Sequence, residues 1–148
     1  MFGVTRVVRE HERGVMFRLG KPLDPPRGPG RVWVIPGVDQ LVLVDLRPMT
    51  IDVPPLDVVT KDGAPVSVSL RVRAQVVEPT EAVMRVVDWK EATSMLAETA
   101  LRAILKDRSQ HEALHERGQL ESALRETIAE AAASWGVNVS AVEVHFRN

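Results

Sequence analysis

The chain of 148 residues has a net charge of −1, is 45% hydrophobic and 26% charged, and contains no cysteine. This balance is typical of a folded globular protein and argues against nucleic acid as a partner, while the missing cysteines exclude disulfides and thiolate metal sites. We expect residues 1–148 to form a single domain with its own core. Since no apolar run reaches the roughly 18–20 residues of a membrane-spanning helix, the chain alone is expected to be soluble.

The first half of the chain alternates between apolar and polar residues, a period typical of β-strands. Residues 4–8 and 14–19 are expected to pair as consecutive strands across a polar turn. The proline-rich residues 21–30 are expected to form a loop. Further short strands are expected at residues 32–35, 41–46 and 49–53.

The clearest strand covers residues 66–76. Its even-numbered positions are apolar and its odd-numbered positions are polar. This alternation predicts an antiparallel strand with one buried face and one face in water. Asp62-Gly63, just before the strand, is a strong signal for a hairpin turn.

From Pro79 onward the spacing of apolar residues becomes helical. Pro79 is typical of the first turn of a helix, and Asp88 is expected to cap a second helix. The residues expected to face inward on that second helix are Ala92, Leu96, Ala100 and Ile104.

A third helix is expected over residues 116–134, followed by Gly136 as the residue after its end. Its apolar stripe is Leu120, Leu124, Ile128, Ala131 and Trp135. A closing strand is expected at 137–146, with a bulge near Ala141 where the apolar positions change from odd to even numbers. Strands, then helices and one returning strand predict an α+β fold, in which an antiparallel or mixed sheet packs against the helices.

Short motifs follow one another along the chain, and each one taken singly is explained by turns, core packing or a surface ion pair such as Asp45 with Arg47. The motifs are residues 8–20, Gly28-Pro29-Gly30 with Pro36 and Asp39, Val44-Asp45-Leu46-Arg47, Asp52-Val53-Pro54-Pro55, Thr60-Lys61-Asp62-Gly63, Leu101-Arg102, Trp135-Gly136-Val137 and Val142-Glu143-Val144. Their order and spacing resemble the core domain of the stomatin and prohibitin proteins, the SPFH or Band 7 superfamily, and in particular its stomatin-like (slipin) branch.

The resemblance implies a non-enzymatic scaffold without a cofactor, on the cytoplasmic face of the cell membrane. Such proteins form homo-oligomers and organise or regulate membrane proteins such as proteases and channels. Bacterial relatives are often paired with a small membrane partner of the NfeD type. The N-terminal edge is then the side nearest the membrane. Weak interfacial contacts from Phe2, Arg6, Arg9 and Arg13 are one interpretation of this edge, and a surface loop with scattered charge is the favoured one.

Two alternatives accompany this interpretation. The chain is expected to lack the upstream membrane hairpin and the downstream coiled coil of the family, which leaves a soluble, anchor-free adaptor as one alternative. The other is a zinc-dependent peptidase, because residues 111–115 read HEALH in one-letter code.

In the peptidase interpretation His111 and His115 lie on one helix face, Glu112 is the general base and Glu121 is the third ligand. The longer form of this zinc motif requires a methionine-containing turn downstream, but the last methionine of the chain is Met95. We therefore favour two surface histidines on a short helix, and expect no catalytic, metal-binding or cofactor-binding residue.

Overall fold

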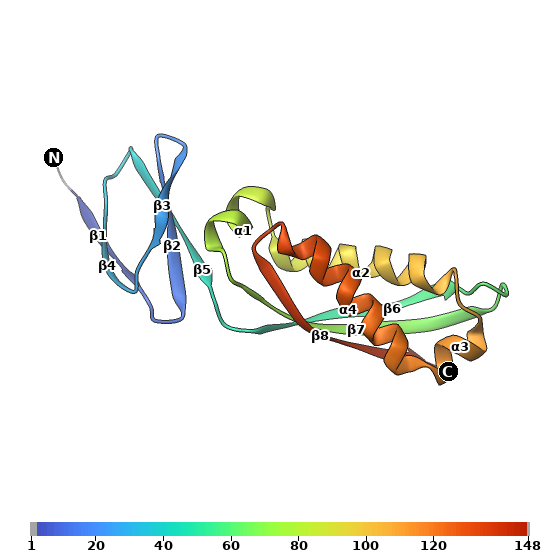
Figure 1. Cartoon of the computed structure of the whole chain (residues 1–148). Helices are drawn as coiled ribbons and strands as arrows, with labels where there is room; N and C mark the ends of the chain where they lie inside the picture. Colours follow the sequence, from blue (N-terminus) through green and yellow to red (C-terminus); the bar gives the residue numbers. More distant parts are fainter. Residues whose placement is uncertain (1–2, 148) are drawn as a thin grey trace.

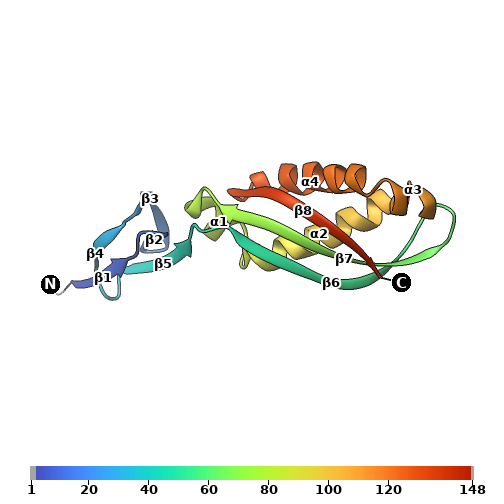
Figure 2. The ribbon, with the colours of Figure 1, turned by 90° about the horizontal axis from the view of Figure 1, so that it is seen from below.

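Two small β-sheets lie at one end of the elongated molecule, and a larger sheet covered by helices forms the rest (Figures 1 and 2). This arrangement is that of a computed structural model, which describes residues 3–147. The strands are β1 (Val4–Val8), β2 (Glu12–Arg18), β3 (Lys21–Arg27), β4 (Gly30–Val34), β5 (Asp39–Asp45), β6 (Met49–Val59), β7 (Pro65–Val76) and β8 (Val137–Arg147). The helices are α1 (Pro79–Arg85), α2 (Trp89–Leu105), α3 (Gln110–His115) and α4 (Arg117–Ala133). The expected α+β fold with a returning strand is confirmed.

The N-terminal strands pair differently from the expectation. β1 does not pair with β2; it pairs antiparallel with β4, and β2 lies between β3 and β5. The loop expected at residues 21–30 is instead β3 and the start of β4. A two-residue turn explains this, because Leu19 and Gly20 both have positive φ, 51° and 82°, and so fold β3 directly back onto β2. β3 tolerates its prolines because it is an edge strand, where a missing N–H costs no bond to a neighbour.

The larger sheet has the order β6-β7-β8, with both pairs antiparallel. All even-numbered residues from 66 to 76 are buried, as their alternation predicted. β6 runs six residues beyond the expected end because the register shift between Val53 and Leu56 accommodates Pro54-Pro55 on this edge strand. The bulge expected near Ala141 is confirmed, since Arg73 pairs with Ala141 and the next residue of β7 pairs with Val139.

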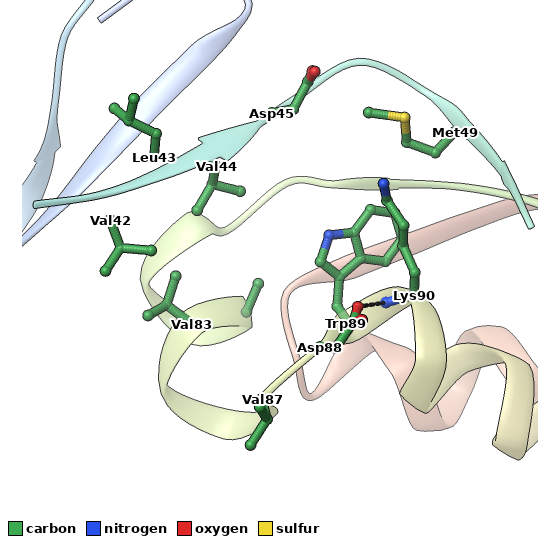
Figure 3. Close-up of a pocket in the computed structure, with 11 residues that line it drawn as sticks. Val42, Leu43, Val44, Asp45, Met49, Val83, Val87, Asp88, Trp89 and Lys90 are labelled. Atoms are coloured by element: carbon green, nitrogen blue, oxygen red, sulfur yellow. Dashed lines mark hydrogen bonds between the residues drawn. The ribbon is translucent and has the colours of Figure 1, made fainter.

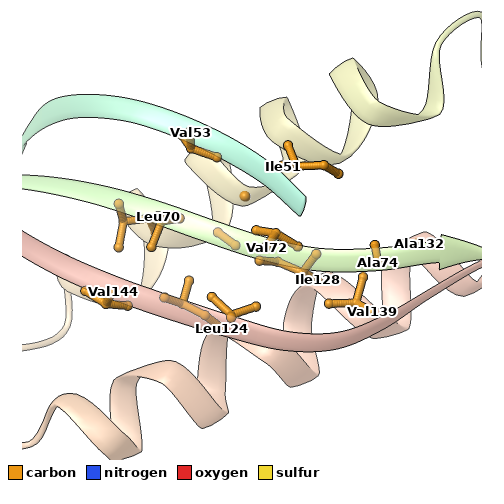
Figure 4. Close-up of a cluster of buried hydrophobic side chains, with 14 of the residues drawn as sticks. Ile51, Val53, Leu70, Val72, Ala74, Leu124, Ile128, Ala132, Val139 and Val144 are labelled. Atoms are coloured by element: carbon orange, nitrogen blue, oxygen red, sulfur yellow. The ribbon is translucent and has the colours of Figure 1, made fainter. Parts of the chain in front are cut away.

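Helices α2 and α4 lie side by side on one face of the larger sheet and enclose the main core (Figures 1 and 4). On α4 the expected residues Leu120, Leu124 and Ile128 are fully buried, and Ala132 is buried in place of Ala131. Trp135, the last residue of the expected stripe, lies past the end of the helix and is partly buried against the core. Each buried leucine or isoleucine stabilises the fold by about 1.5–3 kcal/mol relative to an exposed one. The sheet residues that meet these side chains include Ile51, Val53, Leu70, Val72, Ala74, Val139 and Val144.

The buried face of α2 is rotated from the expected one. Among the expected inward residues, those that are only half-buried are Ala92, Leu96 and Ile104. The fully buried residues are Thr93, Ala97, Ala100, Leu101 and Leu105. Thr93 is accommodated in an apolar core because its hydroxyl donates to the carbonyl of Trp89 at 2.7 Å. Because threonine does not count as apolar in the sequence pattern, the expected stripe lies one residue before the observed one.

Helix α1 connects the small sheets to the larger one. Ala82 of α1 is buried in the same apolar cluster as Val15 of β2 and Val44 of β5. The hydroxyl of Thr80 also donates to the carboxylate of Asp24 in β3, at 3.3 Å. The expectation of one domain over residues 1–148 stays a prediction. Among the helices of residues 3–147, none is both long and apolar enough to cross a membrane.

Gly136 offers a sharp test of the junction between α4 and β8. It has a φ of +71°, and an added Cβ would stand 2.5 Å from the carbonyl oxygen of Glu78. We expect Gly136→Ala to lower the free energy of unfolding by about 2 kcal/mol or more, because left-handed backbone costs an alanine about 1–2 kcal/mol before any clash. Urea unfolding followed by circular dichroism measures this difference.

The matched control is Gly118→Ala. Gly118 lies in the first turn of α4, and no atom lies within 4 Å of an added Cβ. Alanine is the better helix former, so this variant should gain up to about 1 kcal/mol. Equal effects of the two substitutions would contradict the geometry described for Gly136.

Candidate interaction surfaces

The histidine pair, His111 and His115, lies on the short exposed helix α3. As the spacing predicted, the two side chains share one face, and their rings stack with centroids 4.1 Å apart at an angle of 29°. The Nδ1 atom of His115 lies 2.9 Å from the carbonyl oxygen of His111. One ring nitrogen of His115 is therefore already engaged within the helix.

The two glutamates of the peptidase interpretation have other partners. Glu112 belongs to the cap of α3, where its N–H donates to the hydroxyl of Ser109 at 3.2 Å and its carboxylate accepts from the same hydroxyl at 3.3 Å. Glu121 on α4 forms an ion pair with Arg117 at 3.5 Å. Within residues 3–147, no three histidine, aspartate or glutamate side chains are grouped so that they could hold a metal ion. The structure brings the two histidines together and does not add Glu121 to them.

The motif Thr60-Lys61-Asp62-Gly63 fixes the position of α3. The buried hydroxyl of Thr60 donates to the carboxylate of Asp62, and that carboxylate also accepts the N–H of Gln110, at the start of α3, at 3.3 Å. The N–H of Lys61 donates to the carbonyl of Arg108 at 2.8 Å. The hydrogen bond from Thr60, joined by backbone N–H groups, lowers the pKa of Asp62. The β6–β7 turn is thus tied to the loop before α3.

An open groove of about 480 Å³ lies between β5 and the α1–α2 connection (Figure 3). Figure 3 shows the Trp89 ring between the start of α2 and the β5–β6 connection. The apolar side chains of the groove are Val42, Leu43, Val44, Met49, Ala82, Val83, Val87 and Trp89. Its charged members are Asp45, Asp88 and Lys90.

Both acids of this groove are engaged. Asp88 caps α2, as expected from the sequence, by accepting the N–H groups of Lys90 and Glu91 at 3.1 and 3.4 Å. Asp45 pairs with Arg47, as also expected, with Nη2 to Oδ2 at 2.7 Å and the backbone N–H of Arg47 to Oδ1 at 2.9 Å. The guanidinium hydrogen bond lowers the pKa of Asp45 to about 2, although burial acts in the opposite direction. Both acids of the groove therefore have structural roles, in an ion pair and in a helix cap.

The N-terminal ribbon, formed by β1 and β4, lies at the far end of the molecule from α3 (Figure 1). Thr5 stands opposite Trp33 in the register, and Val7 stands opposite Arg31. Opposed residues share a face, so one side of the ribbon carries all four of these side chains. Trp33 is 69% exposed and Val7 is 65% exposed. This apolar surface next to an arginine is the most water-exposed aromatic site of the described chain.

Four residues were considered for membrane contact from the sequence, Phe2, Arg6, Arg9 and Arg13, and the three that the structure describes do not all share a face with Trp33. Phe2 lies outside the described residues, and Arg6, opposite Val32, lies on the other face of the ribbon. Arg9 is exposed, and the guanidinium of Arg13 is engaged with backbone carbonyls of its own turn. Trp33 was not among the residues expected at this edge, because the alternation of residues around it does not indicate which face of the ribbon stays uncovered.

Charge is divided unevenly between the two ends of the chain. The first 47 residues contain eight basic and five acidic side chains. The remaining 101 residues contain eleven basic and fifteen acidic ones. The small sheets are therefore the basic end of a molecule that is nearly neutral as a whole.

Comparisons with known proteins agree with the fold. The model of the "SPFH domain / Band 7 family" matches residues 6–145. A stomatin homologue of Pyrococcus horikoshii is 41% identical over 139 residues, which are 94% of this chain and 52% of that protein. Mouse stomatin is 35% identical over 140 residues, 94% of this chain and 49% of stomatin, and an uncharacterised protein of Archaeoglobus fulgidus is 44% identical over 144 residues, 97% of this chain and 57% of that protein. The chain spans about half the length of these relatives.

Asp62→Ala tests the connection to α3. The variant loses the carboxylate that holds the N–H of Gln110, so the amides of residues 108–116 should exchange with solvent roughly tenfold faster. Hydrogen exchange read by mass spectrometry measures this. Asp57→Ala removes a carboxylate from the exposed face of β6 and should leave α3 unchanged; protection of α3 that is equal in both variants would contradict the assigned role.

Arg47→Gln tests the ion pair beside the groove. Because the pKa of Asp45 is about 2 in the folded chain and 3.8 ordinarily, the pair contributes stability above about pH 4 and loses it as the pH falls toward 2. In the variant, the carboxyl pKa should rise toward 3.8, which carbon NMR of the side chain can follow. Arg71→Gln, which removes the distant pair with Asp52, should not move it. An Asp45 pKa that stays near 2 without Arg47 would refute the assignment.

Proposed function

Because this chain belongs to the SPFH domain / Band 7 family, we propose that it is a membrane-associated, stomatin-like scaffold domain that self-associates and organises neighbouring membrane proteins. The family match over residues 6–145 is the observation that carries this proposal, and the named stomatin relatives at 35 and 41% identity support it. At a finer level, we propose the cytoplasmic face of the membrane as its location. Membrane proteases or channels are its proposed clients, and a small membrane protein of the NfeD type its proposed partner.

The N-terminal ribbon supports the membrane side of this proposal. Trp33 and Val7 form an exposed apolar surface, and Arg31 stands beside them on the same face. Tryptophan with a neighbouring cation is a favourable combination at the boundary between lipid headgroups and acyl chains. The excess of basic side chains in the first 47 residues adds attraction to an anionic leaflet.

We further propose that the scaffold acts without catalysis. In the groove beside β5, Asp45 is held by Arg47 and Asp88 caps the start of α2, so both acids have structural roles. No specific observation favours the peptidase alternative, because Glu121 is paired with Arg117 away from the histidine pair. The anchor-free adaptor remains an alternative, and membrane binding distinguishes it from the scaffold.

The test is flotation of the purified chain with lipid vesicles, combined with light scattering and crosslinking in solution. We expect the chain to float with vesicles and to show masses above its monomer mass of 16.4 kDa. Trp33→Ser should weaken flotation several-fold, because it removes the exposed aromatic ring of the ribbon. Met95→Ser is the control, since Met95 is 62% exposed on α2, far from the ribbon. A strictly monomeric chain that does not float would overturn the proposed function.

A further inference from the structure

Next to the N-terminal ribbon, an open pocket of about 410 Å³ is lined by three arginines. They come from three strands: Arg18 ends β2, Arg27 ends β3 and Arg31 follows the first residue of β4. Its other lining residues are Met16, Gly28, Pro29, Val32 and Trp33, and no acidic side chain lines it. We refer to this site as the arginine pocket. Neither the family match nor any motif of the sequence assigns it a ligand.

One of the three arginines is held in place by a carboxylate. Arg18 donates to Asp39 through two nitrogens, Nε to Oδ1 at 2.8 Å and Nη2 to Oδ2 at 3.2 Å. Asp39 also accepts the N–H of Ile35 at 3.0 Å, so its position is fixed as well. The pKa of Asp39 is lowered, first by the hydrogen bond from Arg18, with the charge of Arg27 adding a smaller contribution.

The other two arginines have no acidic partner. Among residues 3–147, neither Arg27 nor Arg31 forms a salt bridge, and Asp39 is already hydrogen-bonded to Arg18. Three guanidinium groups against a single carboxylate leave an excess of about two positive charges. Arg27 is half-buried and lines the pocket. A ligand that carries about two negative charges on a compact group would balance this excess.

We propose that the arginine pocket binds a phosphate group through Arg27 and Arg31, and that this group belongs to the headgroup of an acidic phospholipid. Planar guanidinium groups match phosphate oxygens with paired hydrogen bonds, which makes arginine well suited to this group. The position of the pocket favours a lipid as the source of the phosphate. Trp33 lines the pocket and is also exposed on the ribbon, so a bound headgroup would place the acyl chains of its lipid beside an apolar surface. This inference rests on the proposed membrane association and names its ligand.

Vesicle flotation with lipids of different phosphate charge tests the proposal. The vesicles contain phosphatidylcholine alone, or with phosphatidylserine, or with phosphatidic acid, whose monoester phosphate carries the highest charge. The chain should bind phosphatidic acid vesicles most tightly. Arg27→Gln with Arg31→Gln should weaken that binding about tenfold or more, because each basic side chain near an anionic surface contributes about 1 kcal/mol. Binding to pure phosphatidylcholine should change little.

The matched control is Arg73→Gln with Arg125→Gln, which removes the same charge from β7 and α4. Neither arginine forms a salt bridge in the part of the chain that the structure describes. The control should retain tight binding to phosphatidic acid vesicles. Circular dichroism melting verifies that all variants fold, and the single substitution Arg31→Gln, at an exposed position, provides a second variant with an intermediate loss.

Soluble glycerol phosphate, titrated while the tryptophan emission of the chain is followed, with the variant Trp33→Phe showing which part of the signal comes from Trp33, distinguishes the source of the phosphate. Stronger binding to phosphatidic acid vesicles than to glycerol phosphate, with both lost in the double variant, supports a lipid headgroup. Saturable binding of glycerol phosphate without any vesicle binding supports a phosphate site in the pocket, but overturns the lipid as its source and the proposed membrane association. Equal binding of parent and double variant to every vesicle overturns the arginine pocket while membrane association stands. A phosphopeptide or RNA that binds more tightly at the same salt concentration overturns the lipid assignment.

Discussion

The alternation of side chains along β7 is the constraint on which the rest of the structure depends. Its even-numbered residues are apolar and buried under α2 and α4, and its odd-numbered residues face water. A slip of one residue would bring Arg71 and Arg73 into the core and expose the apolar set, so the register with β6 and β8 is strongly fixed. Because β7 is the central strand, both edge strands and both long helices take their positions from it.

The two ends of β7 lead to surfaces of different character. At its start, the turn around Asp62 holds the loop before α3 and places the histidine pair in water. Past its end, the N–H groups of Val77 and Glu78 donate to the carbonyl of Gly136, where α4 turns into β8, and α1 then packs against the small sheets. The end at α3 is thus held by hydrogen bonds to the turn around Asp62, whereas the other end supports the strands that carry Trp33, Arg27 and Arg31.

Signals between neighbouring residues predicted much of this fold. Features that depend on residues far apart in the sequence were not predicted. Residues 66–76, the cap at Asp88, the glycine after α4 and the bulge near Ala141 each follow from neighbouring residues. The pairing of β1 with β4 and the proline-containing edge strand depend on which strands meet across the sheet. The arginine pocket shares this difficulty, because its members come from three strands and one of those was expected to be a loop. The motif at Thr60 identified the family from its spacing, while its role as a tie to α3 required the structure.

An elongated shape combined with divided charge has a consequence for orientation. The basic end, with the N-terminal ribbon and the arginine pocket, lies opposite the end that carries α3 (Figures 1 and 2). Near an anionic leaflet such a charge distribution favours one orientation, with the ribbon toward the lipid and the acidic remainder away from it, within about 8 Å of the surface at physiological salt. Copies that all bind with the N-terminal ribbon toward the membrane would face one another through the sides of the molecule, which carry the β6-β7-β8 sheet and the helices. Under the proposed function, the membrane therefore aligns the copies before they associate, which restricts the faces that can form contacts and lowers the orientational cost of assembly.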